Sequence, residues 1–418
     1  MRKTRVLSLL LALSLLFVLV PTLSGCRHKI VATDLMAGIT PRENGEPAAV
    51  PTDGAAAAAD FAARLFLATY DGKNTLLSPL SVLVALAMTA NGAAGETRAQ
   101  MESALGMTVG ELNAFFAGYL ASLNKDDGVT LALADSIWLR DDPRFSVKED
   151  FLQINADVYR AGAFRAPFDK TTVKDINQWV KDHTDGLIDQ ILDDLQSDDL
   201  AVLINALLFD GKWASPYEHD TQRSSGPFHK EDGTDVTVTF LSGTESRYLS
   251  DGDRATGFVK PYEGGRYAFA ALLPAEGTSL ADYVATLSGE RIAEILESVE
   301  RVAVETKLPK FKTRFETDLK DALSKMGMTD AFLLEKADFT GISETTPLYI
   351  GEVRHKTYIE VGEKGTRAGA VTAVRGKTAS ARSDEVPPVI LDRPFVYILF
   401  DTTTNIPLFI GALNDPNG

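Results

Sequence analysis

Two short motifs in the chain have the spacing of a known serine chemistry. Ser122-Leu123-Asn124-Lys125 satisfies S-x-x-K, and Lys377-Thr378 begins a K-T-G-like triplet, a combination found in enzymes that form a seryl ester with penicillin. Ala379 stands where that triplet requires glycine, and no Ser-Asp-Asn lies between the two motifs. A penicillin-recognising protein is therefore an alternative that fails at two of its three motifs.

Other catalytic patterns are missing from the sequence. It contains neither G-x-S-x-G nor H-E-x-x-H, and its five histidines are scattered without the spacing of metal ligands. We therefore expect a protein that is not an enzyme, with no metal and no cofactor.

The stretch from Gly362 to Pro388 is the part that a packed domain explains least. It holds no aromatic residue, leucine or isoleucine, and a structureless segment of this length is normally functional or disordered. Alternate positions from Thr366 to Val374 are small or β-branched, whereas Arg367 and Arg375 fall on the other face. The pattern predicts a strand without a neighbour in sequence, with a plain surface linker as the alternative.

The elements that must carry this segment form a mixed α+β pattern. Apolar spacing predicts a helix over residues 55–70, and Ser78-Pro79 predicts the start of a buried helix that ends before Asn91-Gly92. A third helix has Ile176, Trp179, Val180 and His183 on one face. Strands are predicted within residues 200–209, 267–273, 302–306 and 395–400. The sequence therefore predicts large sheets combined with helices.

The N-terminus has the layout of a secretory signal. Three basic residues precede the apolar run Val6–Val20, and Pro21 follows too soon for a comfortable membrane span. Leu23-Ser24-Gly25-Cys26 resembles a bacterial lipobox, which implies cleavage before Cys26 and a lipid on its sulfur. We expect residues 1–25 to be the signal peptide, and the mature protein to be extracytoplasmic and anchored to the bacterial cell membrane through Cys26.

Composition places further bounds on the mature chain. Cys26 is the only cysteine, so no disulfide can form within one molecule. The net charge of −16 argues against nucleic acid as a partner and against direct adhesion to an anionic membrane surface. Residues 26–54 mix proline, glycine and charges without an apolar period, which predicts a flexible tether. We expect residues 55–418 to form a single monomeric domain.

A set of short motifs in a fixed order makes the chain resemble the serpin family over nearly the whole mature domain. The segment Glu363-Lys364-Gly365-Thr366-Arg367-Ala368-Gly369-Ala370 resembles the serpin hinge. The other motifs are Ser78-Pro79-Leu80-Ser81, Asn177-Gln178-Trp179-Val180, Asn205-Ala206 through Gly211-Lys212-Trp213, Leu308-Pro309-Lys310-Phe311, Ala337–Ile342, His355-Lys356, Asp392-Arg393-Pro394-Phe395 and Pro407–Gly411. The resemblance implies a large central β-sheet, further sheets, eight or nine helices and an exposed reactive loop at about residues 362–390.

The resemblance also implies a function, which is suicide-substrate inhibition of serine proteases and, as an extension, of cysteine proteases. Counting as in the family places the reactive bond at Ala379–Ser380, which suits an elastase-like or subtilisin-like target. Arg382–Ser383 offers a trypsin-like enzyme a competing bond.

Further site residues are carried over by their match to family motifs. The hinge is expected at Glu363, Gly365, Thr366, Ala368, Gly369 and Ala370, where small residues allow insertion into the sheet. Control of sheet opening is expected from Ser78, Ser81, Asn205, Trp213 and His355. For the buried polar residues among them, a cluster that simply satisfies its own hydrogen bonds is the alternative.

Two binding functions remain as alternatives to inhibition. A serpin-like protein that no longer inhibits and only binds would carry a charge or proline at the inward positions, where Thr366 and small residues stand instead. A solute-binding lipoprotein would fit the lipobox and the acidity but would leave residues 362–388 unexplained.

Overall fold

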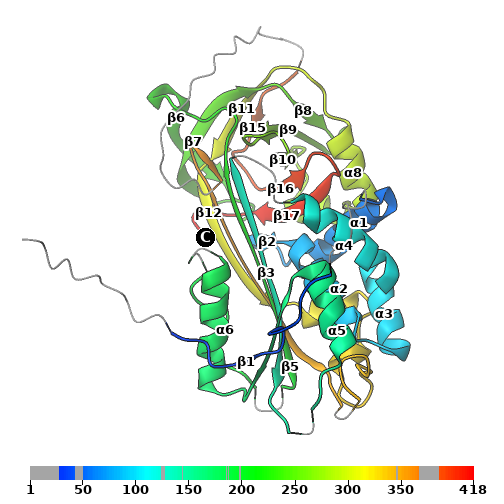
Figure 1. Cartoon of the computed structure of the whole chain (residues 1–418). Helices are drawn as coiled ribbons and strands as arrows, with labels where there is room; N and C mark the ends of the chain where they lie inside the picture. The colour runs from blue at the N-terminus through cyan, green and yellow to red at the C-terminus, as the bar shows by residue number, and fades with distance from the viewer. Residues whose placement is uncertain are drawn as a thin grey trace, which may run out of the picture.

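A large mixed β-sheet forms the centre of the molecule, and two further sheets and helices pack around it (Figure 1). The computed structural model describes residues 28–42, 50–123, 128–143, 145–184, 186, 188–196, 199–344, 347–366 and 386–418. Within these ranges there are nine α-helices and sheets of seven, six and four strands. The predicted α+β architecture is confirmed.

The seven-stranded sheet carries the residues of interest. In spatial order its strands are β1 (Thr33–Asp34), β4 (Gly162–Ala166), β3 (Val129–Arg140), β5 (Ala201–Lys212), β14 (Gly365–Thr366), β13 (Ile350–Val361) and β12 (Phe311–Asp318). The apolar run predicted as a doubly buried strand is β5, whose residues 201–205 and 207–209 are buried. Strands β3, β5 and β13 have 12 residues each. The central sheet therefore extends far beyond the usual strand length of about six residues.

Two smaller sheets lie next to the large one. The six-stranded sheet contains β2 (Thr75–Leu77), β17 (Ile406–Leu413), β16 (Phe395–Asp401), β10 (Tyr267–Pro274), β9 (Ala255–Pro261) and β8 (Tyr248–Ser250). The four-stranded sheet contains β15 (Val389–Ile390), β11 (Val304–Pro309), β7 (Asp235–Glu245) and β6 (Arg223–His229). Since β14 belongs to the large sheet and β15 to the small one, the two ends of the predicted reactive loop are fixed in different sheets.

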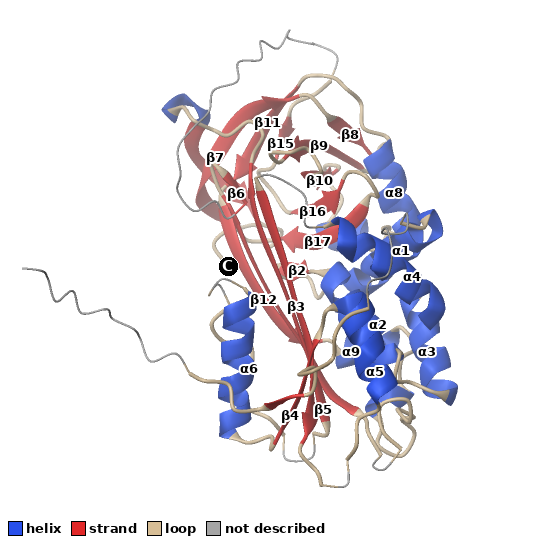
Figure 2. Ribbon diagram, viewed as in Figure 1, coloured by secondary structure: helices blue, strands red, loops and turns tan. Residues whose placement is uncertain are grey.

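The helices are divided unequally between the two faces of the large sheet (Figure 2). Helix α6 lies on one face, whereas on the other side α2 packs against β3 and β5, with α1, α3 and α4 packed in turn on α2. Their bounds are α1 Thr52–Thr69, α2 Pro79–Ala90, α3 Gly95–Leu105, α4 Val109–Ser122, α5 Glu149–Ile154, α6 Lys170–His183, α7 Leu280–Val284, α8 Gly289–Glu297 and α9 Lys320–Lys325, with short turns η1 Asn155–Tyr159, η2 Asp220–Gln222 and η3 Asp330–Phe332. All residues of α2 are buried, as its predicted apolar run required.

The segment before the first helix differs from the expected flexible tether. Within it, β1 pairs with β4 as an additional edge strand. The Asp175 carboxylate of α6, which is 1% exposed, accepts hydrogen bonds from the backbone amides of Val31 and Ala32 at 3.1 and 2.7 Å. Backbone amides of this segment therefore find hydrogen-bond partners on the domain. These bonds hold the segment against β4 and α6.

Within the described part of the chain, none of the helices is both long and apolar enough to span a membrane. The apolar run Val6–Val20 and Cys26 lie outside the described residues.

Candidate functional site: hinge and latch of the large sheet

The hinge strand β14 lies between two long strands of the large sheet. Gly365 pairs with Lys212 and Thr366 with Gly211 of β5, while Thr366 also pairs with Val361 of β13. Both pairings are antiparallel. The hinge residues Gly365 and Thr366 thus occupy a strand position at one end of the cleft between β5 and β13.

Each of these two residues fits its position for a physical reason. A Cβ atom at Gly365 would stand 2.0 Å from the carbonyl oxygen of Gly211, so no larger residue fits without moving the backbone. Thr366 is 1% exposed, and its hydroxyl group forms a buried hydrogen bond with that of Tyr262. Its side chain therefore points into the molecule, as the alternation of small residues predicts.

Hydrogen bonds to backbone carbonyls hold the turn that leads into β14. The indole Nε1 of Trp213 donates to the carbonyl oxygen of Gly362 at 2.9 Å. The backbone amides of Trp213 and Tyr217 donate to the carbonyls of Lys364 and Glu363 at 2.9 and 2.8 Å. Trp213 therefore contacts the turn that leads into the hinge, and its predicted role in sheet opening stays a prediction.

Glu363 adds an ion pair at the surface of the same turn. Its carboxylate lies 2.8 Å from Nζ of Lys310 and 3.5 Å from Nε of Arg223. Partial burial opposes ionisation, but the hydrogen bond from Lys310 and the two positive charges outweigh it, so the pKa of Glu363 is lowered. The pair is partly exposed and is therefore a weak restraint compared with the backbone bonds.

A buried ion pair lies beneath the hinge. The ammonium of Lys260, 2% exposed, lies 2.6 Å from Glu245 and donates to the carbonyl of Ser215 at 2.9 Å. It also sits above the rings of Tyr217 and Trp213, 4.4 and 5.5 Å from their centres. Burial raises the pKa of Glu245, although Lys260 opposes that rise. Sequence analysis missed this pair because the two residues lie on different strands and match no motif.

The latch is a buried cluster of Ser78, Ser81, Asn205 and His355 at the other end of the same cleft. Its members come from the start of α2, from β5 and from β13, and each is at most 2% exposed. Ser81 Oγ donates to Asn205 Oδ1 at 2.8 Å, and Ser78 N–H donates to His355 Nε2 at 3.1 Å. Four of the five sequence-predicted control residues are thus brought together, whereas the fifth, Trp213, lies at the hinge. Ser78 makes no side-chain bond as a helix cap.

The hydrogen bonds determine the tautomer of His355. Because Nε2 accepts the bond from Ser78, the proton lies on Nδ1, which donates to Asn205 Oδ1 at 2.8 Å. Complete burial disfavours the charged ring and lowers the pKa of His355 to about 3. The latch therefore works with a neutral histidine that joins β13 to β5.

Asp135 of β3 also touches the latch, and sequence analysis did not single it out. Its Oδ1 accepts from Asn205 Nδ2 at 2.5 Å, and Asp135 is paired directly with Asn205 in the ladder between β3 and β5. Burial raises its pKa well above the usual value, against the hydrogen bond from Asn205. An acidic residue at the centre of a mainly apolar strand was the signal that could have identified it.

The ladder between β5 and β13 covers only part of their length. It runs in parallel from Ala201 with Ile350 to Asn205 with His355, and residues 206–210 of β5, all described in the structure, have no partner on β13. By contrast, β3 and β5 pair over residues 129–139 and 201–211, and β12 and β13 over residues 311–318 and 354–361. The cleft between β5 and β13 is therefore the place where the sheet can part.

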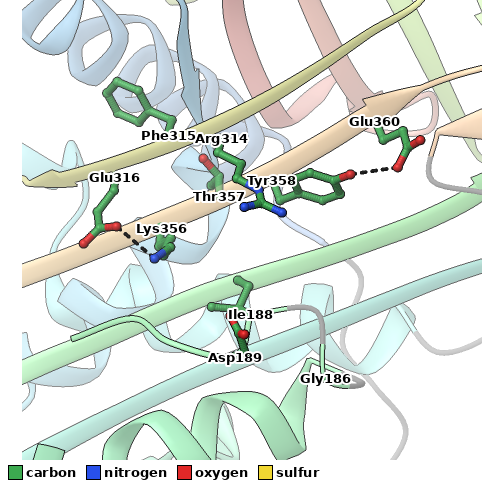
Figure 3. A pocket seen from close by; sticks show the side chains of 10 residues that line it. All are labelled: Gly186, Ile188, Asp189, Arg314, Phe315, Glu316, Lys356, Thr357, Tyr358 and Glu360. Carbon is green, nitrogen blue, oxygen red and sulfur yellow. Dashed lines mark hydrogen bonds and ion pairs between the residues drawn. The ribbon is translucent and has the colours of Figure 1, made fainter. Parts of the chain in front are cut away.

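A hollow on the α6 face lies beside this cleft and shows how β13 is held to β12 (Figure 3). It has a volume of about 560 Å³ and lies between Gly186, Ile188 and Asp189 on one side and the two strands on the other. Lys356 pairs with Glu316 at 2.9 Å, and the guanidinium of Arg314 lies 5.5 Å from the ring centre of Tyr358. These cross-strand pairs favour movement of β12 and β13 as one unit.

Several predicted positions lie outside the described residues. They are the hinge residues Ala368, Gly369 and Ala370, the bonds Ala379–Ser380 and Arg382–Ser383, and the lipidation site Cys26. Among the side chains that are described, no group of three or more His, Cys, Asp or Glu is arranged to hold a metal ion.

Two features define the class of protein. The short strand β14 lies between two long strands of the large sheet, and the segment after it leads to β15 in a different sheet. The family model for serpins, serine protease inhibitors, matches residues 56–416. The chain belongs to the serpin family.

Known relatives and structures agree with this assignment. An uncharacterized serpin-like protein of Thermococcus kodakarensis is 32% identical over 356 residues, covering 83% of this chain and 82% of that protein. The native state of the thermophilic serpin tengpin has a TM-score of 0.86 at 40% identity and covers 92% of this chain and 99% of that structure. The latent state of tengpin has a TM-score of 0.76 at 39% identity, covering 90% and 100%. The arrangement described here is thus more similar to the native state.

Proposed function

We propose that this serpin is a suicide-substrate inhibitor of serine proteases, and by extension of cysteine proteases, that traps the acyl-enzyme by inserting its cleaved loop into the large sheet. The observation that carries the proposal is β14, which is paired on both sides between β5 and β13, while residues 206–210 of β5, between β14 and the ladder that ends at Asn205, are not paired with β13. Only Gly365 and Thr366 occupy this strand position, at the end of the cleft next to residues 211 and 212 of β5.

The register of β14 supports insertion of the following residues. If its antiparallel pairing with β5 continued, positions 367–371 would lie opposite residues 210–206, where β5 and β13 are not paired. Positions 372–376 would then lie opposite residues 205–201. Entry beyond position 371 therefore requires the bond between Asn205 and His355 to break, which makes the latch the second barrier to insertion.

Cleavage would supply the freedom that full insertion needs. The protease serine attacks the scissile carbonyl, an acyl-enzyme forms, and the amine of the following residue leaves, so the loop is no longer held at β15. Residues 366–379 span about 45 Å at roughly 3.3 Å each, so the attached protease would be carried along the sheet. If this distorts the oxyanion hole, each lost donor slows turnover by about 10²–10³.

Hydrogen bonds provide part of the driving force. Roughly a dozen inserted residues, each gaining about 0.5–1.5 kcal/mol from ladder bonds, contribute on the order of 10 kcal/mol before burial is counted. A native state this far above its inserted form is held by kinetic barriers. We assign the kinetic barrier against insertion to the latch and to the uncut loop.

We place the reactive bond at Ala379–Ser380, with Arg382–Ser383 as the competing bond. Alanine suits the small primary pocket of an elastase-like or subtilisin-like protease, and arginine suits a trypsin-like one. The test is to mix the domain with one protease of each type and look for a complex that survives denaturing electrophoresis. Mass spectrometry of the released C-terminal peptide then identifies the bond, and cleavage without any stable complex would refute the proposed inhibition.

We further propose that the protein is a bacterial lipoprotein held on the outer face of the cell membrane by Cys26. The supporting features are the signal-like residues 1–25 and the lipobox-like Leu23–Cys26. Metabolic labelling with palmitate should mark the wild type and not Cys26→Ala, which should appear in the soluble fraction. An unlabelled wild-type protein would contradict the anchor without affecting the inhibitory mechanism.

A further inference from the structure

Residues 28–34, which we call the N-terminal strap, are fixed to the domain very close to the proposed lipid anchor. Nε2 of His28 lies 2.6 Å from the buried carboxylate of Asp175 on α6, which also accepts a hydrogen bond from the amide of Val31. Cys26 precedes His28 by two residues, so their Cα atoms are at most about 7 Å apart. A lipid on Cys26 therefore holds α6 and the strap at the bilayer surface, and not at the end of a long tether.

The strap alternates between residues that face the domain and residues that face solvent. Ile30 and Ala32 pack on the apolar cluster that contains Trp179, whereas Lys29 and Val31 are exposed. Val31 is 64% exposed, the largest value among the large apolar side chains that the structure describes. A single exposed valine is ordinary on a soluble surface. Next to a lysine and a lipid anchor, however, it suits the boundary between headgroups and acyl chains.

Helix α6 adds a row of lysines beside the strap. Lys170, Lys174 and Lys181 are all exposed. With about 100° per residue, these three positions lie within about 40° of one another around the helix axis. The buried Ile176 and Trp179 lie on the opposite side of the helix. The row of lysines therefore faces away from the large sheet.

We propose that Lys29 and Val31 of the strap, with Lys170, Lys174 and Lys181 of α6, form a docking surface for the phospholipid bilayer that carries the anchor. The ammonium groups bind headgroup phosphates, and Val31 enters the boundary with the acyl chains. This inference rests on the proposed lipid anchor, which brings the surface to the bilayer. It is independent of the inhibitory mechanism.

The net charge of −16 is compatible with this contact because charge acts locally. At physiological ionic strength the screening length is about 8 Å, so carboxylates elsewhere on the domain hardly act at the headgroups. The exposed carboxylates on the same elements are Asp34, Asp169 and Asp182. Lysine side chains are longer and carry their charge further from the backbone. The anchor also keeps the surface at a high effective concentration of lipid, so weak contacts are sufficient.

The docking surface and the hinge lie at different levels of the large sheet (Figure 1). Thr33 of β1 pairs with Arg165 of β4, and this level of the sheet continues through β3 to Ala201 at the start of β5. The hinge strand β14 pairs with residues 211 and 212 of β5. Ten residues of strand correspond to about 33 Å. Docking therefore leaves the hinge end accessible to a protease.

The test supplies the anchor chemically and uses the lysines themselves as probes. The mature chain that begins at Cys26 retains every described residue and is coupled through its only thiol to a maleimide lipid. The vesicles contain phosphatidylethanolamine and phosphatidylglycerol. A water-soluble acetylating reagent then modifies exposed lysines, and mass spectrometry measures the rate at each one. The reference is the same protein with its thiol blocked, mixed with vesicles that lack maleimide.

Coupling should slow acetylation of the four lysines of the docking surface by about threefold or more, because amines that contact headgroups are less accessible to the reagent. The exposed Lys307 on β11 and Lys325 on α9 should react at the same rate in both samples. These two residues report on the hinge end and on the helices across the sheet.

Charge reversal tests the role of the lysines. The double variant Lys170→Glu/Lys174→Glu should lose most of the protection at Lys29 and Lys181, while its melting temperature shows that the domain is folded. Lys325→Glu makes the same kind of charge change away from the docking surface and should leave the protection intact.

Three results would overturn the docking surface. They are equal acetylation of its lysines in coupled and reference protein, equal protection of Lys307 and Lys325, and protection that survives the double reversal. Because coupling replaces lipidation, a negative result here contradicts the surface and not the anchor. The palmitate experiment tests the anchor separately.

Discussion

The hinge and the latch lie at opposite ends of one cleft, and they hold it by different means. At the hinge, the cleft already contains a strand, which is held mainly by backbone carbonyls of residues 362–364 and by the pairing of β14. At the latch, no strand has entered, and the bonds that cross the cleft involve the side chains of Asn205 and His355 as well as a short ladder. We therefore expect the hinge to tolerate many side-chain substitutions and the latch to tolerate few.

The difference has a direct physical consequence. Backbone bonds at the hinge survive many changes of side chain, provided that the new residue is small enough to remain between β5 and β13. The latch depends on the chemical identity of a few buried groups, each with a defined donor or acceptor role. Truncating one of these side chains therefore leaves its hydrogen-bond partners unsatisfied. We therefore expect size and charge to matter at the hinge, and hydrogen-bonding capacity to matter at the latch.

The largest effect is expected when a charge is placed at the inward hinge position. Thr366→Arg would bury an unpaired cation between β5 and β13, which costs several kcal/mol and should stop insertion. The variant should become a substrate that is cleaved without forming the stable complex, as judged by denaturing electrophoresis and by inhibitor consumed per protease. Thr366→Ser, which keeps the hydroxyl bonded to Tyr262, is the control. Undiminished complex formation by Thr366→Arg would disprove the insertion mechanism.

A smaller but still large effect is expected from the latch. His355→Ala leaves the amide of Ser78 and the oxygen of Asn205 each without one partner, at a cost of about 1–3 kcal/mol. Since these bonds must break for the sheet to open, spontaneous conversion to the inserted form should be about 5–150 times faster. The measurement is the decay of inhibitory activity at constant temperature, with the exposed His219→Ala as the control. Equal decay rates in wild type and His355→Ala would remove the latch from the mechanism.

The comparison also predicts a pH dependence at the latch. His355 stays neutral in the folded protein down to its pKa of about 3, whereas the unfolded chain binds a proton below about 6.5. Its contribution to the free energy of unfolding is therefore complete above pH 6.5 and falls as the pH drops, by up to about 1.4 kcal/mol per pH unit. The raised pKa of Asp135 acts in the opposite direction, with stability lost as the pH rises above 3.8.

A difference measurement separates these two contributions. Urea denaturation at a series of pH values gives the free energy of unfolding from the first transition. As the pH falls from 6.5 to 4, this free energy should rise for His355→Asn relative to the wild type. Asp135→Asn should instead gain relative to the wild type as the pH rises from 3.8. Parallel pH curves for the wild type and His355→Asn would show that the histidine is not held neutral by burial.

The smallest effect is expected for the surface ion pair of the hinge. Glu363→Gln removes the charge that faces Lys310 and Arg223 but keeps the backbone bonds of the turn. Because the pair is partly exposed, the loss should stay below about 1 kcal/mol, and inhibition should change less than fivefold. Rapid kinetics of protease inhibition at low and at 0.5 M salt would measure it. A loss as large as that of His355→Ala would mean that side chains, and not the backbone, hold the hinge.

Much of the fold could be predicted because the spacing of apolar residues and the residues that begin or end helices are local properties of the sequence. Ser78-Pro79 correctly placed the start of α2, and the apolar runs correctly placed β5, β10 and β16. The early segment was less predictable, since residues 28–42 gain their order from Asp175 on α6, more than 130 residues away. A sequence without an apolar period does not reveal a distant partner for its backbone amides.

The residues of the latch were available from the sequence only as separate motif matches. By itself the chain determined which residues are small enough to enter a sheet, at Gly365 and Thr366, because size and branching are properties of each residue. The tertiary structure alone decided that Asn205, His355 and Asp135 meet, and that Lys260 faces Glu245 beneath Trp213. Such contacts arise from the register between strands distant in sequence, and a hydrogen bond or ion pair exists only once that register has brought donor and acceptor to within about 3 Å.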